Sequence, residues 1–282
     1  MNIVKMKLQS RTLFLPVEVT ITLPESIVYQ PGKRKVIWLL HGAGGDHQSW
    51  LQLPGFHQAM ESRDLIAVMP NALNSDYGSW PDFGTGYDFP KFFFEELMPT
   101  VQRCFPVSDA PEDNYVAGLS MGAYGAALLG LLHPEKFRGV ALYAGSFRRA
   151  QFLEAYRDRP MEEFKKDAIA HPADFPTEYG PPQLGIKRKE VNVISKYASV
   201  EEFYNSPDCM WNRLLELDPQ KAPMFYLACG TEDLFYPATR EIEEKMKEMG
   251  ITSCRFVYQE DTGHDPFFMG EQFGQSLTWF GL

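Results

Sequence analysis

The segment that most constrains the fold is 115–137, YVAGLSMGAYGAALLGLLHPEKF, which carries GLSMG at positions 118–122. The G-x-S-x-G pattern alone is weak, since average glycine and serine contents produce it by chance in roughly one chain in ten of this length. Its context is more specific, because an apolar strand-like run precedes Ser120 and an apolar helix-like run follows it. Strand, turn and helix in this order are the setting of a nucleophile elbow, in which the flanking glycines let two backbones approach closely. The pattern therefore predicts Ser120 as a nucleophile, the alternative being an N-cap serine at a glycine-rich helix start.

Short apolar runs divide the rest of the chain into predicted strands. They lie at 35–40, 65–69, 114–117, 139–143, 224–228 and 254–258. Most are apolar on both faces, which is typical of parallel strands covered by helices on each side. Helical patterns at 87–104, 234–249 and 271–280 separate or follow them, and 14–23 alternates like antiparallel edge strands. We therefore predict an α/β fold with a doubly wound, mostly parallel sheet and helices on both faces.

The chain of 282 residues is predicted to form a single domain, 1–282, because its length suits one large α/β unit. One segment, at about 146–221, breaks the pattern with more charge and proline, and it lies between two predicted core strands. We expect this insertion segment to form a cap or lid over one end of the sheet. Loops on a rigid scaffold commonly carry binding determinants, so the segment is expected to influence substrate choice.

The net charge and the composition limit the classes of molecule that the protein is expected to bind. The net charge is −10 and no basic run occurs, which argues against nucleic acid or an anionic membrane surface. The first residues lack the apolar core of a signal peptide, and glycines interrupt the longest uncharged stretch, 115–134. The four cysteines have no metal-site spacing. These features predict a cytoplasmic protein with a small-molecule partner; the oligomeric state, including a homo-oligomer, stays open.

The turn after the 35–40 run is predicted to complete an oxyanion hole. It reads HGAGGDH at 41–47, a flexible loop with free backbone N–H groups. One donor should be the N–H of Met121, which follows the nucleophile, and the other that of Ala43 or a neighbouring glycine. A phosphate-binding loop is the alternative. It is disfavoured because HGAGGDH has neither the G-K-[ST] ending nor the G-x-G-x-x-G spacing.

An acid and a histidine are expected after later strands. Asp233 follows the strand-like run MFYLACG and is the predicted acid, with Glu232 as its neighbouring alternative; both could instead simply favour a helix N-terminus. Of six histidines only His264 follows Asp233 in the chain. The order Ser120, Asp233, His264 is the nucleophile, acid, histidine order of α/β-hydrolases. All three should lie at the carboxyl ends of strands, where open α/β sheets bind ligands.

Aromatic and small residues near these loops are candidates for a substrate pocket. Trp80 is expected to form a wall from the loop after the 65–69 run, while core packing is an alternative for the phenylalanines. The candidate pocket residues are Trp80, Gly42, Phe235 and Phe267. Aromatic residues that could stack on a sugar are Trp50, Tyr77, Trp80 and Phe83.

The chain resembles the tributyrin esterase group of bacterial α/β-hydrolases, within the esterase D-like set that includes carbohydrate esterase family 1. The matching pieces run from about residue 36 to the C-terminus and include WLLHGAGGDHQSW, VAGLSMGAYGAALLGLLHPEKF, ACGTEDLFYPATREIEEKMKEMG and TGHDPFFMGEQF, whereas 146–221 matches poorly. The resemblance implies an α/β-hydrolase fold and serine carboxylesterase activity on short-chain acyl esters, without cofactor or metal. It also implies that Ser120, Asp233 and His264 form the triad, with Met121 and Ala43 as oxyanion donors.

Several other functions use the same residues. Acetyl or feruloyl esterases of carbohydrate esters are a narrower form of this prediction, and acyltransferases and thioesterases share the acyl-enzyme intermediate. Thioesterases acting on S-formylglutathione typically read HGLT after the strand; HGAG at 41–44 disfavours that activity here. A binding protein on a hydrolase scaffold is the alternative without catalysis. The intact set of Ser120, Asp233 and His264 argues against it.

Overall fold

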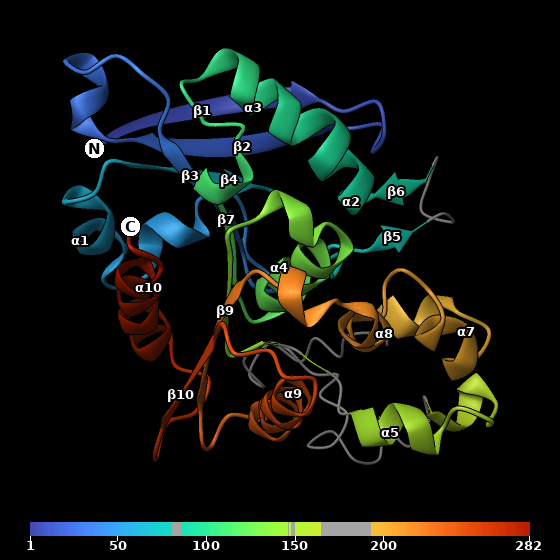
Figure 1. Ribbon diagram of the computed structural model, residues 1–282. Helices are drawn as coiled ribbons and strands as arrows, with labels where there is room; N and C mark the ends of the chain where they lie inside the picture. The colour runs from blue at the N-terminus through green and yellow to red at the C-terminus, as the bar shows by residue number, and fades with distance from the viewer. Residues whose placement is uncertain (81–85, 146, 148–149, 165–192) are drawn as a thin grey trace, which may run out of the picture.

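The central feature of the computed structural model, which describes residues 1–80, 86–145, 147, 150–164 and 193–282, is one eight-stranded sheet (Figure 1). The strand order is β1-β2-β4-β3-β7-β8-β9-β10. β2 is antiparallel to both β1 and β4, and all other neighbours are parallel. The predicted doubly wound, mostly parallel sheet is therefore confirmed. The strands are β1 Asn2–Gln9, β2 Pro16–Leu23, β3 Lys35–Leu40, β4 Leu65–Pro70, β7 Asn114–Leu119, β8 Gly139–Tyr143, β9 Met224–Gly230 and β10 Cys254–Gln259.

The antiparallel edge differs from the prediction in one respect. The alternating run at 14–23 forms β2, but β2 is the second strand, and the edge is β1, which the sequence analysis did not assign. β1 pairs with β2 along its whole length, from Asn2 opposite Leu23 to Gln9 opposite Pro16. No β1 residue is fully buried, since an edge strand exposes much of its surface, and its lysines place charge on that edge.

Helices cover both faces of the sheet (Figure 1). α1 and α10 pack on one face, and α2, α3, α4, α8 and α9 contribute to the core of the other. The helix predicted at 271–280 begins earlier, at Pro266, because the Asp265 side chain accepts a hydrogen bond from the N–H of Phe267 and caps it. The helices are α1 Phe56–Glu61, α2 Phe89–Phe92, α3 Met98–Cys104, α4 Met121–Leu132, α5 Ala150–Ala155, α7 Val200–Tyr204, α8 Met210–Glu216, α9 Tyr236–Glu248 and α10 Pro266–Phe280.

The helix predicted at 87–104 is interrupted. Its first two residues form β6, Tyr87–Asp88, which pairs with β5, Ser79–Trp80, in a separate two-stranded sheet. Helix α2 follows, and a π-helical stretch, Phe93–Leu97, joins it to α3. The position of Trp80 therefore depends on its pairing with Tyr87, a residue that the sequence analysis assigned to a helix.

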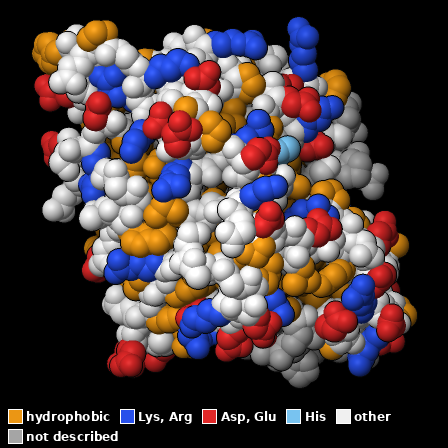
Figure 2. All heavy atoms as spheres, in the orientation of Figure 1, with side chains coloured by type: hydrophobic (Ala, Val, Ile, Leu, Met, Phe, Trp, Pro, Cys, Tyr) orange, Lys and Arg blue, Asp and Glu red, His pale blue; other side chains and the backbone are white. Residues whose placement is uncertain are grey.

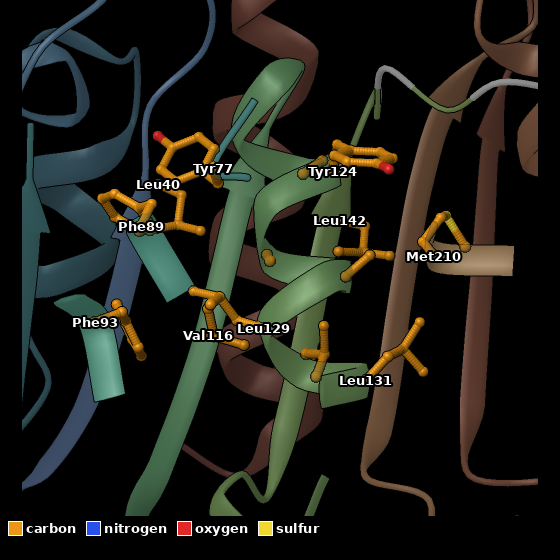
Figure 3. Close-up of a cluster of buried hydrophobic side chains, with 14 of the residues drawn as sticks. Leu40, Tyr77, Phe89, Phe93, Val116, Tyr124, Leu129, Leu131, Leu142 and Met210 are labelled. Atoms are coloured by element: carbon orange, nitrogen blue, oxygen red, sulfur yellow. The ribbon is translucent and has the colours of Figure 1, made fainter. Parts of the chain in front are cut away.

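Two hydrophobic cores result from the two-residue period of the buried strands. In β3, Val36, Trp38 and Leu40 face one core, and Ile37 and Leu39 face the other. Figure 3 shows part of the first core, in which Val116 of β7 lies beside Leu129 of α4. Burial of each such aliphatic side chain contributes about 1.5–3 kcal/mol, so the cores place the strand ends firmly.

The insertion segment lies between β8 and β9. Its described part includes α5, α7 and α8, and α8 packs against α4. Met210 of α8 belongs to the same buried cluster as Leu142 of β8 (Figure 3). Residues 165–192 of the predicted cap lie outside the described residues. On the face drawn in Figure 2, acidic and basic side chains are interspersed.

None of the helices in the described ranges has the length and apolar character that crossing a membrane requires.

Candidate active site

Ser120 occupies a strained turn between β7 and α4. Its φ of 55° and ψ of −119° lie in a region that non-glycine residues rarely adopt, at a cost of about 1–3 kcal/mol. Two backbone hydrogen bonds hold the turn: the Ser120 N–H donates to the Tyr143 carbonyl at 2.9 Å, and its carbonyl accepts from the N–H of Ala123 at 3.0 Å. Ser120 is the N-cap residue of α4, but its side chain makes no capping hydrogen bond to that helix.

The two glycines of the pattern are required by close backbone contacts. A Cβ atom at Gly118 would lie 1.9 Å from the carbonyl oxygen of Gly122, and one at Gly122 would lie 2.1 Å from that of Leu40. Both separations are far inside van der Waals contact, and the partner atoms are backbone. The predicted close approach of strand and helix at the elbow is therefore confirmed.

The loop after β3 lies directly against the elbow. A Cβ at Gly42 would meet the Leu119 side chain at 2.9 Å and Ser120 Cβ at 3.4 Å. The contact follows from the topology, because β3 and β7 are neighbouring parallel strands. The chain continues from β3 to β4 on one side and from β7 to β8 on the other, so the two loops flank the switch point of the sheet, where α/β folds bind ligands.

His41 orients the peptide that follows it. Its Nδ1–H donates to the Gly42 carbonyl at 2.8 Å, while its Nε2 accepts from the N–H of Ala72 at 3.0 Å, which assigns the tautomer. The Gly42 carbonyl also accepts from the N–H of Gly45 at 3.1 Å. Because a trans peptide is planar, the Ala43 N–H points away from this carbonyl. Burial lowers the pKa of His41, which favours the neutral imidazole that these contacts need.

Two backbone donors are left near Ser120. Within the part of the chain that the structure describes, the N–H groups of Ala43 and Met121 make no hydrogen bond. Both adjoin residues whose positions are set by close packing, Gly42 and Ser120. Two unpaired N–H groups beside a strained serine can stabilise a negatively charged oxygen.

Asp233 and His264 are in contact. Asp233 lies in the loop after β9 with a fully buried side chain, and its Oδ2 accepts a hydrogen bond from His264 Nδ1 at 2.7 Å. Its Oδ1 accepts from the N–H of Phe235 at 2.9 Å. The neighbouring Glu232 is exposed instead, and its N–H donates to the Thr262 carbonyl at 2.9 Å, which ties the two loops together. His264 thus pairs with Asp233 and not with Glu232.

Ser120, Asp233 and His264 all follow the carboxyl ends of parallel strands, β7, β9 and β10. Among the described residues no hydrogen bond joins Ser120 Oγ to His264. His264 Nε2 likewise has no protein partner there, and its side chain is 35% exposed. The imidazole therefore presents a free nitrogen with a fixed tautomer at the edge of the sheet that carries the serine.

The candidate pocket residues lie in different surroundings. Gly42 adjoins Ser120, and the buried ring of Phe235 lies 5.6 Å from that of His264. Phe267 is 71% exposed. Trp80 is half-buried, and its indole N–H donates to the Ser75 carbonyl at 2.6 Å.

Sugar stacking is wrong for two of the suggested aromatics. Trp50 is fully buried in the core against Phe273 and Tyr143. Tyr77 is also fully buried, and its hydroxyl donates to the His41 carbonyl at 2.8 Å. Phe83 lies outside the described residues. Large aromatics fill cores as readily as they line pockets, and composition cannot separate the two.

A buried carboxylate that the sequence analysis missed lies next to α4. Asp208 of the insertion segment is 2% exposed, and its backbone carbonyl accepts a hydrogen bond from Tyr124, one turn after Ser120. Its partner Ser79 comes from a distant part of the chain, whereas Lys196 precedes it by 12 residues in the same segment. No local spacing signals such a contact. Among the described residues, no cluster of three or more His, Cys, Asp or Glu could hold a metal ion.

The amino-acid sequence matches a known protein family. Residues 10–277 match the family described as "Putative esterase". An acetyl esterase from Caldicellulosiruptor saccharolyticus is 24% identical over 247 residues, which cover 87% of this chain and 82% of that protein. An S-formylglutathione hydrolase from Bos taurus is 29% identical over 136 residues, 41% of this chain and 47% of that protein.

A solved structure shares the architecture. The fluorophosphonate-binding serine hydrolase F of Staphylococcus aureus superposes with a TM-score of 0.74 at 18% identity, over 99% of this chain and 98% of that one. At this identity the likeness concerns the fold alone. It confirms the predicted α/β-hydrolase fold.

Proposed function

Since the chain belongs to the "Putative esterase" family and is a carboxylic ester hydrolase, we propose that it hydrolyses short-chain acyl esters through a triad of Ser120, Asp233 and His264. The observation that carries the proposal is the 2.7 Å hydrogen bond between Asp233 and His264, at the edge of the sheet where strained Ser120 also lies. The substrate is a small-molecule ester. Neither metal nor cofactor takes part in the proposed reaction.

The proposed chemistry assigns a separate task to each group. His264 Nε2 accepts the Ser120 proton as Oγ attacks the ester carbonyl, and Asp233 orients the imidazole and stabilises its protonated form. The N–H groups of Met121 and Ala43 hold the oxyanion, and each such donor contributes roughly 3 kcal/mol to barrier lowering. His264 then returns the proton to the departing alcohol. Water, activated by the same imidazole, releases the acid from Ser120.

The separation of Ser120 from His264 is compatible with this mechanism. Catalytic hydrogen bonds are often long or misaligned in a free enzyme and shorten when substrate binds. The two residues that must be fixed beforehand, the acid and the histidine, are already in contact. A substrate carbonyl held by the two free N–H groups would bring the reacting atoms to Ser120 Oγ.

Short acyl chains are proposed on two grounds. The motifs of this chain resemble the tributyrin esterase group, and the relative from Caldicellulosiruptor saccharolyticus is an acetyl esterase by name. We further propose that the insertion segment belongs to the same single domain and limits the size of the substrate, because α8 packs on α4, the helix that begins beside Ser120.

Hydrolysis of p-nitrophenyl esters from acetate to decanoate, by wild type and Ser120→Ala in parallel, tests the proposal. We expect turnover that declines with chain length and is lost in the variant. Equal turnover of acetate and decanoate would overturn the short-chain assignment. Retained activity in Ser120→Ala would overturn the triad.

A thioesterase is the second candidate, favoured by the Bos taurus relative, which is an S-formylglutathione hydrolase by name. HGAG at 41–44 replaces the HGLT that is typical of that activity. Comparison of kcat/KM for S-acetylglutathione and p-nitrophenyl acetate separates the two. An esterase is expected to prefer the oxygen ester; a strong preference for the thioester would favour this second candidate.

A further inference from the structure

Asp208 is the centre of a buried polar network outside the triad. Its Oδ2 accepts hydrogen bonds from Lys196 Nζ and, at 2.7 Å, from the Tyr197 hydroxyl. Its Oδ1 accepts from the N–H of Ser79 at 3.3 Å, and its backbone carbonyl accepts from the Tyr124 hydroxyl. A buried carboxylate is tolerated only when it is paired and hydrogen-bonded, and this one is both.

The network joins three parts of the chain that are far apart in sequence. Asp208 and Lys196 belong to the insertion segment, Ser79 to β5 after the β4 loop, and Tyr124 to the first turn of α4. β4 and β8, from which the first two parts emerge, lie on opposite sides of β7. The network therefore joins segments from both sides of β7, and it contacts α4 at Tyr124, one helical turn beyond Ser120.

Lys196 extends this network to Trp80. Its ammonium group donates to the Ser79 carbonyl, pairs with Asp208, and lies 5.2 Å from the centre of the Trp80 ring. Lys196 is only 11% exposed, so its attraction to the ring is little weakened by water. The indole N–H is fixed separately, by the Ser75 carbonyl. The Trp80 side chain is thus held at two points, at its ring by Lys196 and at its indole N–H by the Ser75 carbonyl.

The tyrosine hydroxyls act as permanent donors. Burial raises the pKa of Tyr124 well above its usual value, and burial also raises that of Tyr197. Both hydroxyls therefore keep their protons throughout the pH range in which an esterase works. The two tyrosine hydrogen bonds of the network therefore do not depend on a titrating donor.

We propose that the Lys196–Asp208 pair positions Trp80 as a wall that binds the larger part of the ester. This deepens the proposed function and rests on it, because Trp80 has this role only if Ser120 is acylated. On this proposal, an acetyl ester of a small alcohol is expected to react at Ser120 without contacting Trp80. A bulkier ester is expected to contact the Trp80 ring. Lys196 and Asp208 are thus positioning residues that act through Trp80 on KM.

A charge-removing double variant separates positioning from stability. Lys196→Met or Asp208→Asn alone leaves an uncompensated buried charge or a lost acceptor and is expected to lower Tm. The double variant removes both charges, so Tm is expected to recover towards wild type. We expect its kcat for p-nitrophenyl acetate to stay within about twofold of wild type. Its KM for 2-naphthyl butanoate is expected to rise about fivefold or more, because Trp80 loses the cation that holds its ring in place.

A matched control uses another ion pair of the same segment. Arg157 and Glu201 are joined by a hydrogen bond but are one-third or more exposed, and Arg157 lies over Tyr204 and not over Trp80. Arg157→Met with Glu201→Gln is expected to leave KM for both esters unchanged. A wild-type KM for 2-naphthyl butanoate in the Lys196/Asp208 double variant would overturn the proposal, and so would an equal rise in the control.

Hydrogen exchange distinguishes failure of this proposal from failure of the proposed function. The Ser79 N–H donates to Asp208, so its exchange is expected to accelerate in the double variant and not in the control. This readout needs no substrate. Unchanged Ser79 exchange overturns the positioning role even in an active esterase. If exchange of the Ser79 N–H accelerates in the double variant but the wild-type protein hydrolyses no ester, only the esterase assignment is rejected.

Discussion

His264 Nδ1 lies 2.7 Å from Asp233 Oδ2, although 31 residues separate the two in the chain. The contact crosses between the loops that follow β9 and β10, which are adjacent parallel strands. The carboxylate is completely buried and the imidazole is partly exposed. A hydrogen bond to a buried carboxylate is strong, so the orientation of His264 is set by the fold before any substrate binds.

Replacement of the acid tests this relationship. Asp233→Asn keeps the shape but has one acceptor oxygen for two donors, the N–H of Phe235 and Nδ1–H of His264. We expect kcat for p-nitrophenyl acetate to fall about 10⁴-fold, because the wrong tautomer of His264 is favoured. Glu232→Gln is the matched control, since Glu232 is the exposed neighbour and should change kcat less than about twofold. Equal losses in both variants would contradict the assignment of Asp233.

The proposed role of Ser120 as nucleophile is tested by Ser120→Ala. Alanine tolerates the same backbone without new contacts, so the fold is expected to persist, with an unchanged near-ultraviolet circular dichroism spectrum. Hydrolysis of p-nitrophenyl acetate is expected to fall by about 10⁴-fold or more, and labelling by a fluorophosphonate probe should disappear. Turnover at the wild-type rate would rule out Ser120 as the attacking group.

The buried His41 predicts a pH dependence of stability. Burial lowers its pKa in the folded protein below the 6.5 of an unfolded chain. As pH falls below 6.5, the unfolded chain takes up a proton that the folded protein resists, so the free energy of unfolding decreases. Above that pH both states are neutral at this residue, and the effect vanishes. The slope from this one residue is at most about 1.4 kcal/mol per pH unit.

The variant His41→Gln isolates this contribution. Glutamine can still accept the hydrogen bond from the Ala72 N–H but does not titrate. Urea unfolding at about pH 5 and about pH 8 is expected to show a smaller pH difference in the variant than in wild type. The difference between the two pH values is the readout, so a uniform loss of stability does not affect it. An equal pH difference in both proteins would show that His41 titrates normally.

The elbow glycines predict a large destabilisation from a small substitution. A methyl group at Gly122 would overlap the Leu40 carbonyl oxygen, so Gly122→Ala is expected to cost about 3 kcal/mol or more and to lower Tm. Gly274→Ala in α10 is the control, since its Cβ would lie 3.7 Å from Ala59, an ordinary contact. Alanine is expected to stabilise that helix by about 0.5–1 kcal/mol. A higher Tm for Gly122→Ala than for Gly274→Ala would contradict the close packing described at Gly122.

Local patterns were sufficient for the elements that build the sheet. The parallel strands begin where the apolar runs predicted them, because a strand buried on both faces needs several consecutive apolar residues. β1 was missed, since an edge strand exposes much of its surface and its lysines resemble loop sequence. The π-helical stretch and the β5–β6 pair were missed too. In each, tertiary packing overrides the helical periodicity around Phe93 and Tyr87.

The site was predictable to the extent that its residues follow strands. Ser120, Asp233 and His264 could be selected because a parallel sheet brings the ends of its strands to one edge. The pocket was less predictable. Trp50 and Tyr77 are fully buried in the cores, and a large aromatic residue carries no sequence signal that separates a core position from a site wall.

The sequence by itself determined the α/β order, the glycine-framed elbow and the order of serine, acid and histidine, because these depend on neighbours in the chain and on strand ends. Only the tertiary structure decided which peptide His41 orients and which buried charge pairs with Lys196. Lys196 and Asp208 lie in a segment whose charges resemble any solvated surface. Their pairing emerges only when α4, β5 and the insertion segment exclude water from the same place, since burial is what makes a charge require a partner.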